Sequence, residues 1–219
     1  MFGIGSEVLG RGPGDRMAHP NHYEDDDILV RKVVVGIRDN NCYWFACKKT
    51  GHATLIDASA DPDVIISAAS DLEPLRILIT HGHFDHIEAL ADLQTRLGVP
   101  AGVHFGDLES LSTAPDFTIE DGQKFTVGEA QLTAIHTPGH TPGGTCFTWG
   151  SLLFAGDTLF PGGPGNTWGN NEKFVEIMDS IGKKLFPLGD DVLVMPGHGL
   201  DTTIGTERPH FDEWLLRGW

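Results

Sequence analysis

Short apolar segments separated by polar, glycine-rich turns run along most of the chain. The first two are rich in β-branched and aromatic residues, which predicts strands over residues 28–35 and 42–47 around a turn at Asp39-Asn40-Asn41. Residues 76–80 are nearly all apolar, as is typical of a strand that is buried on both faces. The same pattern predicts further strands over residues 53–56, 101–104, 124–127, 131–135, 145–149, 152–155 and 192–195.

Helices are predicted where helix-end signals or a longer apolar period occur. Asp61-Pro62 supplies an N-cap and a proline at the first helical position. A second helix is predicted over residues 87–97, ended by Gly98 and Pro100. The remaining two are an amphipathic helix over residues 174–185 and a short one over residues 213–216.

No repeat or linker interrupts this pattern. The 219 residues suffice for one substantial core, so residues 27–219 are expected to form a single domain. Residues 1–26 are rich in glycine and end in an acidic run. We expect them to be a peripheral N-terminal leader.

The charge balance narrows the classes of partner. The chain has 31 Asp and Glu against 15 Lys and Arg, a formal net charge of −16. A field of that sign repels nucleic-acid phosphates, so no nucleic-acid partner is expected. A small-molecule substrate is expected instead, and a homo-oligomer is compatible with the sequence.

The cysteines and the apolar runs bear on the location of the protein. Cys42, Cys47 and Cys146 form no CxxC pair and are expected to be buried small hydrophobic residues. No apolar run has the length of a membrane helix, and the N-terminus lacks the apolar core of a signal peptide. We therefore expect a cytoplasmic protein with no membrane partner.

Glycine, histidine and aspartate gather directly after predicted strands. Such loops occupy residues 80–86, 136–144, 156–166 and 196–199. Loops at the ends of strands share the rim of a rigid sheet, so polar groups that are distant in sequence can meet there. The four loops together predict one site.

The first of these loops places His81, His83, Asp85 and His86 within six residues. Their alternation lets two histidines face one ion while Asp85 and His86 face another. Neutral imidazoles and carboxylates are ligands that suit zinc, manganese and iron. The loop therefore predicts a metal site.

Each of the other three loops adds one candidate ligand. His140 lies in His-Thr-Pro-Gly-His-Thr-Pro-Gly (136–143), where two prolines stiffen the loop and pre-organise the ring. Asp157 follows an apolar strand in Gly156-Asp157-Thr158, a position from which a carboxylate can bridge two cations. His198 follows a strand in the same way, after Pro196-Gly197.

These four segments, in this order, resemble the metallo-β-lactamase superfamily. Within it, the motifs at 136–143, 154–160 and 196–198 are most similar to the glyoxalase II-like (hydroxyacylglutathione hydrolase-like) branch, and residues 40–43 and 55–57 resemble its early strands. The resemblance covers about residues 28–205. It implies an α+β fold, the four-layer αβ/βα sandwich, with two mixed β-sheets flanked by helices and the metals at the edge of the sheets.

The resemblance also implies a ligand for each position of a dinuclear centre. His81, His83 and His140 match the ligands of the first metal. Asp85, His86 and His198 match those of the second, and Asp157 matches the bridging carboxylate. The implied cofactors are two divalent metal ions, Zn²⁺ first, with Fe and Mn as alternatives. True β-lactamases of the family usually lack the bridging aspartate, so Asp157 disfavours β-lactam substrates.

The implied function is that of a metallo-hydrolase, most similar to a glyoxalase II-like thioesterase, which cleaves a thioester or related activated ester. Water held between two cations loses its proton near neutral pH, and the metal-bound hydroxide attacks the carbonyl carbon. Asp85 and Asp157 are the residues expected to be catalytic, Asp85 by orienting the hydroxide or passing a proton to the leaving group.

Three alternatives remain open. A persulfide dioxygenase of the same fold would hold one iron with His81, His140 and Asp157. A lactonase would use the dinuclear centre on a cyclic ester. A metal-binding module without turnover is the alternative that is not an enzyme.

The chain departs from the glyoxalase II pattern in two respects. It ends at Trp219, soon after His198, where glyoxalase II proper has a helical region that helps to hold glutathione, so a glutathione thioester is disfavoured. Asp57-Ala58-Ser59 replaces the usual Asp-x-Gly, and Ile87-Glu88-Ala89 replaces a glycine pair. Neither change is expected to touch a candidate ligand.

Two further features lie close to the predicted site. His104 and His136 end predicted strands and are expected to be hydrogen-bonded neighbours of the site rather than ligands. The segment 160–168 directly follows Asp157. Its aromatic side chains either wall a substrate pocket or form a surface loop packed on Trp168.

Overall fold

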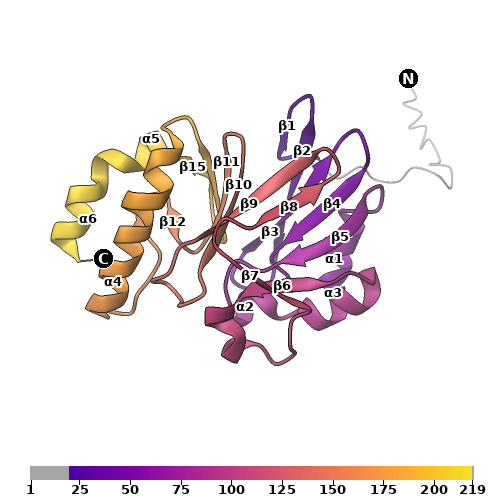
Figure 1. Ribbon diagram of the computed structural model, residues 1–219, viewed down its shortest axis with the longest axis horizontal. Coiled ribbons are helices and arrows are strands. Elements are labelled where there is room, and N and C mark those ends of the chain that lie inside the picture. Colours follow the sequence, from indigo (N-terminus) through magenta and orange to yellow (C-terminus); the bar gives the residue numbers. More distant parts are fainter. Residues whose placement is uncertain (1–19, 219) are drawn as a thin grey trace, which may run out of the picture.

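The computed structural model describes residues 20–218, and the N-terminal half of these residues forms a seven-stranded sheet (Figure 1). Its strands lie side by side in chain order: β1 (Tyr23–Glu24), β2 (Ile28–Val35), β3 (Asn40–Cys47), β4 (His52–Ile56), β5 (Glu73–Leu78), β6 (Ala101–His104) and β7 (Phe117–Ile119). Neighbours are antiparallel from β1 to β4 and parallel from β4 to β7. The carboxyl ends of β4, β5 and β6 therefore meet at one edge.

A six-stranded sheet packs against the first one. In spatial order it contains β15 (Thr202–Thr203), β14 (Leu193–Pro196), β11 (Leu152–Gly156), β10 (Thr145–Trp149), β9 (Ala130–His136) and β8 (Lys124–Val127). Since β11 and β14 are parallel and β10 is antiparallel to both β9 and β11, the carboxyl ends of β9, β11 and β14 share one edge. A separate hairpin joins β12 (Leu159–Phe160) to β13 (Gly163–Pro164).

Helices cover the outer face of each sheet (Figure 1). The first sheet is covered by α1 (Pro62–Ser67), α2 (Phe84–Ile87) and α3 (Leu90–Leu97), and the second by α4 (Asn171–Ser180), α5 (Ile204–Glu207) and α6 (Phe211–Arg217). Further helical turns of the 3₁₀ or π type are η1 (Phe105–Ser110), η2 (Ile181–Leu185), η3 (Phe186–Leu188) and η4 (Arg208–His210).

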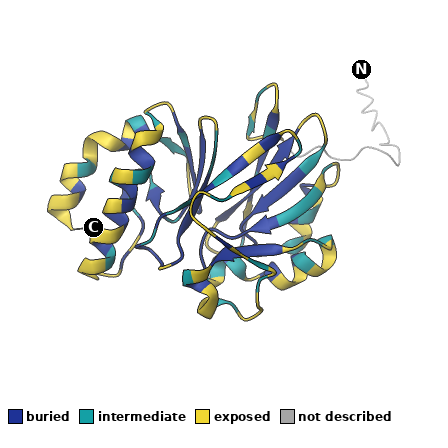
Figure 2. Ribbon diagram, in the orientation of Figure 1, coloured by how far each residue is buried: buried dark blue, intermediate teal, exposed yellow. Residues whose placement is uncertain are grey.

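The central strands of each sheet, such as β3 and β11, are buried on both faces and are dark in Figure 2. Along β3, Trp44 joins the core under α1 and α3, while its neighbour Phe45 joins the core between the sheets. Along β11, Leu153 faces the helices of the second sheet, while Phe154 faces the first sheet. Because successive side chains of a strand point to opposite faces, such strands need a layer on each side.

Two mixed sheets between layers of helices confirm the predicted αβ/βα sandwich. The helix predicted over 87–97 is instead divided into α2 and α3. The reason is that the backbone N–H of Ala89 donates to the carbonyls of Ala58 and Ser59, which ties this point to the loop after β4. The strand predicted over 76–80 begins earlier, at Glu73, and ends at Leu78.

The other sequence expectations divide into confirmed and untested ones. All three cysteines are buried and free, as predicted. Most of the predicted leader lies outside the described residues, although Tyr23–Glu24 pairs with β2 at the sheet edge. The division into a leader and one domain stays a prediction. Within residues 20–218, no helix is both long and apolar enough to cross a membrane.

Packing between the sheets predicts the effect of Phe154→Ala. Phe154 is fully buried, and its ring centroid lies 5.3 Å from that of Tyr43. Removing the ring leaves a cavity, so we expect the free energy of unfolding to fall by about 3–5 kcal/mol in urea denaturation. Leu216→Ala is the control, because Leu216 is 91% exposed and its loss should cost about 0.5 kcal/mol or less. Equal losses in the two variants would contradict this packing.

Candidate metal centre

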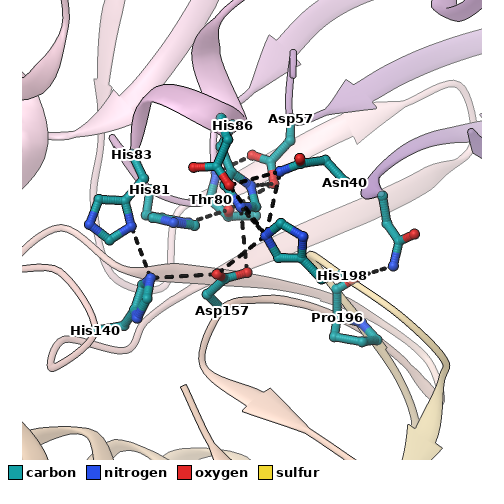
Figure 3. A network of polar contacts seen from close by, with 12 residues as sticks. Asn40, Asp57, Thr80, His81, His83, His86, His140, Asp157, Pro196 and His198 are labelled. Atoms are coloured by element: carbon teal, nitrogen blue, oxygen red, sulfur yellow. Dashed lines mark hydrogen bonds and ion pairs between the residues drawn. The ribbon is translucent and has the colours of Figure 1, made fainter. Parts of the chain in front are cut away.

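The predicted site residues lie at the shared edge of the two sheets (Figure 3). His81 and His83 follow β5, and α2 then contributes Asp85 and His86. The second sheet contributes His140 after β9, Asp157 after β11 and His198 after β14. The structure thus brings together all seven residues that were singled out in the sequence, from both sheets.

His81, His83 and His140 form one group of possible ligands. The Nδ1 atom of His83 and the Nε2 atom of His140 are 2.9 Å apart. The rings of His81 and His140 meet edge to face, with centroids 4.9 Å apart. All three nitrogens can therefore face one small volume.

Asp85, His86 and His198 form a second group. The Nε2 atoms of His86 and His198 are 3.3 Å apart, and His198 Nε2 lies 3.5 Å from a carboxylate oxygen of Asp85. The side-chain amide of Asn40 lies beside this group and donates to Asp85 at 3.3 Å.

Asp157 lies between the two groups. Its Oδ2 atom is 3.5 Å from His140 Nε2 and 3.6 Å from His198 Nε2, while its Oδ1 atom is 3.5 Å from His86 Nε2. Asp157 also forms a third possible ligand set with His81 and His86, one residue from each group. This is the position that a bridging carboxylate needs.

Hydrogen bonds on the far side of three rings orient them toward the centre. The Nδ1–H groups of His86, His140 and His198 donate to the Asp57 carboxylate at 2.8 Å, the Asn166 carbonyl at 2.8 Å and the Arg38 carbonyl at 3.1 Å, respectively. In the neutral form of each ring Nδ1 therefore holds the proton, and Nε2 is the atom left to bind a cation.

The contact of Asp57 corrects one expectation, because the segment that replaces the family's Asp-x-Gly was not expected to touch a candidate ligand. Asp57 directly follows β4 at the same edge, and the backbone N–H and hydroxyl of Thr80 also donate to its carboxylate, each at 2.8 Å. The missed signal was its place at a strand end, the same signal that identified Asp157.

Burial sets the protonation of the rings. Together with neighbouring imidazoles it lowers the pKa of His140 to about 4 and holds the pKa of His81 well below its usual range. Both rings are therefore neutral at pH 7, the form that binds metals. Burial also opposes charge on His86, but Asp57 outweighs it and raises the pKa of His86 to about 9. A cation that displaces this proton would bind more tightly as the pH rises.

The cluster fits a pair of divalent cations. His81 Nε2 and Asp157 Oδ1 are buried polar atoms without a hydrogen-bond partner. Such atoms are costly in a protein interior unless something binds them. Imidazole nitrogens and carboxylate oxygens within 4.8 Å of one another are the donors that such ions take.

Two glycines make room for this arrangement. Gly156 adopts φ +48, and a Cβ atom there would lie 2.7 Å from the Thr80 side chain. A Cβ at Gly197 would lie 2.3 Å from Asp157 Oδ1 and 2.6 Å from the His86 ring. A larger residue at position 197 would therefore displace the central carboxylate.

Asp107 joins the two loops that hold the first group. One of its oxygens accepts from the Gly82 N–H at 2.8 Å and the Thr141 hydroxyl at 2.7 Å, and the other accepts from the Gly143 N–H at 2.7 Å. Gly82 lies between His81 and His83, and Thr141 follows His140. Asp107 lies in η1, outside every motif seen in the sequence. Only its place after β6, at the same edge, could have indicated it.

A cavity of about 530 Å³ opens over the cluster. Its lining includes Arg38, Phe84, Asn166 and Trp168 in addition to five of the candidate ligands, His83, Asp85, His140, Asp157 and His198. Of the two interpretations of segment 160–168, the first therefore holds for Trp168, whose side chain lines the cavity. His104 and His136 lie outside the three ligand groups and stack on each other, with centroids 3.9 Å apart.

Comparison with known proteins places this geometry in a family. The family model described as the metallo-beta-lactamase superfamily matches residues 35–198, which include every candidate ligand. The chain belongs to the metallo-beta-lactamase superfamily. Among curated relatives of this superfamily member, an uncharacterized Aquifex aeolicus protein is 32% identical over 83% of this chain and 94% of its own. A probable metallo-hydrolase, YqgX of Bacillus subtilis, is 34% identical over 63% and 74%.

Solved structures agree with this family. The BLEG-1 B3 metallo-beta-lactamase has a TM-score of 0.77 and 28% identity, covering 83% of this chain and 97% of its own. ETHE1 from Myxococcus xanthus has a TM-score of 0.73 and 29% identity, covering 83% and 82%. TTHA1623 in a di-iron-bound form has a TM-score of 0.67 and 29% identity, covering 81% and 96%.

The role of Asp57 in this metallo-beta-lactamase fold predicts the effect of Asp57→Asn. Loss of the carboxylate makes the neutral His86 ring a weaker ligand, so at a pH where His86 is deprotonated the affinity of the second group for a divalent cation should fall about 10–100-fold. Calorimetric titration of the metal-free protein measures this as weakening of one of two binding steps. Asp63→Asn, at a carboxylate whose side chain is 88% exposed, is the control and should leave both steps unchanged. If both metal-binding steps of Asp57→Asn match those of the wild type, Asp57 does not tune the second group.

The contacts of Asp107 predict the effect of Asp107→Asn. An amide has one acceptor oxygen where the carboxylate has two, so at least one buried donor loses its partner and the free energy of unfolding should fall by about 1–3 kcal/mol. Urea denaturation with a chelator present separates this effect from metal binding. Asp92→Asn, which breaks an exposed pair with Arg96, should cost at most about 1 kcal/mol. If Asp107→Asn is as stable as this control, Asp107 does not stabilise the two loops that it joins.

Proposed function

We propose that the protein is a metal-dependent hydrolase that cleaves a thioester or a related activated ester at a dinuclear centre. The observation behind this proposal is the position of Asp157, which lies within 3.6 Å of nitrogens from both ligand groups. A closed structural zinc site uses four ligands, whereas seven donors gather here and five of them line an open cavity. An accessible pair of cations is what hydrolysis requires.

The proposed ligands are His81, His83 and His140 for one cation, Asp85, His86 and His198 for the other, and Asp157 for both. Zn²⁺ is the proposed ion because five imidazoles are ligands that it favours. The di-iron form of TTHA1623 supports Fe as the main alternative, and Mn suits the same donors. Metal analysis of the purified protein distinguishes the three.

Bound divalent cations would supply Lewis acidity, which activates water and polarises a carbonyl oxygen. The side chains prepare the site for that chemistry. His86 lowers the pKa of Asp85 despite the opposing effect of burial, so Asp85 is ionised and can accept a hydrogen bond from water. In the net reaction the C–S bond of the thioester breaks, a C–O bond to water forms, and the thiolate takes up one proton of the water.

A glyoxalase II-like thioesterase is the more specific form of this proposal. It is supported by the bridging position of Asp157 and by the loop motifs around His140 and His198. The segment between His198 and α6 supports a thiol other than glutathione, because its one arginine, Arg208, is not free to bind a glutathione carboxylate. Arg208 pairs with Asp190 and donates to the Phe186 carbonyl. We further propose a small-molecule substrate and a cytoplasmic location. A homo-oligomer is compatible with the proposal, and the molar mass in solution tests it.

The rival is a mononuclear iron dioxygenase that uses His81, His140 and Asp157. The similarity to ETHE1 supports it. The second ligand group favours the hydrolase. Outer hydrogen bonds to Asp57 and the Arg38 carbonyl orient His86 and His198, just as the Asn166 carbonyl orients His140 in the first group. One iron with oxygen consumption would identify the dioxygenase, and two metals with thiol release would identify the hydrolase. A lactone substrate in the same assay separates the lactonase.

The proposal predicts the behaviour of Asp157→Ala and His140→Ala. Each removes a ligand that no neighbour replaces, so thiol release from an acyl thioester should fall to the background rate. The fold, measured by far-UV circular dichroism, should persist. Chelation should have the same effect on the wild type, and Zn²⁺ should restore only the wild type.

His52→Ala is the matched control. His52 is the first residue of β4, at the end of the strand away from the site, whereas Asp57, which contacts the site, follows the last residue of β4. It should keep the wild-type rate. Near-normal thiol release by either ligand variant would overturn the assignment of the site.

A further inference from the structure

The cavity over the metal centre extends beyond the candidate ligands. A second cavity of about 130 Å³ lies beside the main one, with Arg38, Phe84 and Asp85 lining both. The main cavity of about 530 Å³ already has the size of a typical small-molecule pocket. A substrate larger than its reacting group can therefore lie across Arg38 and Phe84.

Trp168 forms one wall of this cavity and is held there by its backbone. It adopts φ +51, a left-handed conformation that is rare for a bulky residue and that occurs where the surrounding structure imposes it. Its N–H donates to the Asn166 side chain at 2.7 Å, and the carbonyl of Asn166 accepts from His140. The loop that orients a candidate ligand thus also fixes the indole.

The indole lies over the ligand rings and is open to solvent. Its centroid is 5.3 Å from that of His83 and 5.2 Å from that of His140, yet Trp168 is 58% exposed. Phe84, 71% exposed, lines the same cavity. Both aromatic side chains line the cavity beside a polar centre, and a flat apolar group can stack on the exposed part of the Trp168 ring, which the Lys173 ammonium also approaches at 5.7 Å.

Arg38 gives the same cavity a positive charge. It is the one lysine or arginine that lines the cavity among the residues described, in a chain whose formal net charge is −16. Its guanidinium is 3.5 Å from Asp85 and its side chain is 68% exposed. Its carbonyl accepts from His198, which fixes the β2–β3 turn against the centre. A guanidinium so placed can form a two-pronged contact with a carboxylate.

We propose that this site selects substrates that carry a flat apolar group and a carboxylate in addition to the reacting bond, with Trp168 as the stacking surface and Arg38 as the carboxylate-binding residue. This inference rests on the proposed hydrolase for the reacting bond only. Trp168 and Arg38 would determine which ester or thioester binds. They would not determine whether it is cleaved.

A matched pair of thioesters tests the selection. The phenylacetyl and 4-carboxyphenylacetyl thioesters of N-acetylcysteamine differ only in the carboxylate, and a second pair carries the same rings on the thiol side. In at least one pair, kcat/KM of the wild type should be about tenfold higher for the carboxylate member, as a charged hydrogen bond provides. Arg38→Met should abolish this ratio, and Trp168→Ala should lower kcat/KM for both members about tenfold.

Binding provides a readout that does not depend on turnover. The thioether analogue of the 4-carboxyphenylacetyl thioester, in which CH₂ replaces the carbonyl, cannot be hydrolysed, and calorimetry measures its dissociation constant for the purified protein. Arg38→Met and Trp168→Ala should each weaken binding about tenfold. Lys49→Met is the control, since Lys49 is an exposed cation paired with Glu129 and lies outside the lining of both cavities. It should match the wild type.

The outcomes separate this inference from the proposed function. Analogue binding that depends on Arg38 and Trp168, without cleavage of any thioester or activated ester, would support the inference and overturn the hydrolase. Cleavage of both members at equal rates, with variants that bind the analogue like the wild type, would support the hydrolase and overturn the inference. Absence of both binding and cleavage would overturn both.

Discussion

The largely buried carboxylate of Asp157 is the group on which the arrangement of the site depends. A carboxylate removed from water is costly unless opposite charges surround it, and burial raises the pKa of this one. The contacts around it make its position tolerable. His86 and His198 lie close to its oxygens, and Gly197 leaves the space that it occupies. The outer hydrogen bonds then keep the imidazoles turned toward it, so the centre is organised before any ion arrives.

Most strands and all seven candidate ligands could be predicted from the sequence, because the apolar pattern marks strands locally and the ligands directly follow strands. Alternating apolar runs identified β2, β6, β8 and β10 closely, and the position of His140 and Asp157 after such runs indicated that they would meet. A side chain at a strand end is carried to a known edge whatever the distance along the chain. The four-layer arrangement was available only through the family resemblance, since the apolar pattern does not say which sheet a strand joins.

The parts that were missed depend on contacts between distant segments. Nothing near Asp107 in the sequence resembles a functional motif, and its role follows from three donors on two other loops. The break between α2 and α3 likewise follows from the contact of Ala89 with the loop after β4. The helical pattern of residues 87–97 is continuous, so a local interpretation joins what a tertiary contact divides.

The division of the ligands between two sheets has a consequence for folding. His81, His83, Asp85 and His86 come from the first sheet, and His140, Asp157 and His198 from the second. A cation bound to either group is therefore a cross-link between the two halves of the molecule, and only the assembled sandwich offers it a full set of donors. By mass action, such an ion raises the free energy of unfolding, and the gain grows with the logarithm of the ratio of its free concentration to its dissociation constant. The resistance of the protein to heat would then vary with the supply of metal in its surroundings.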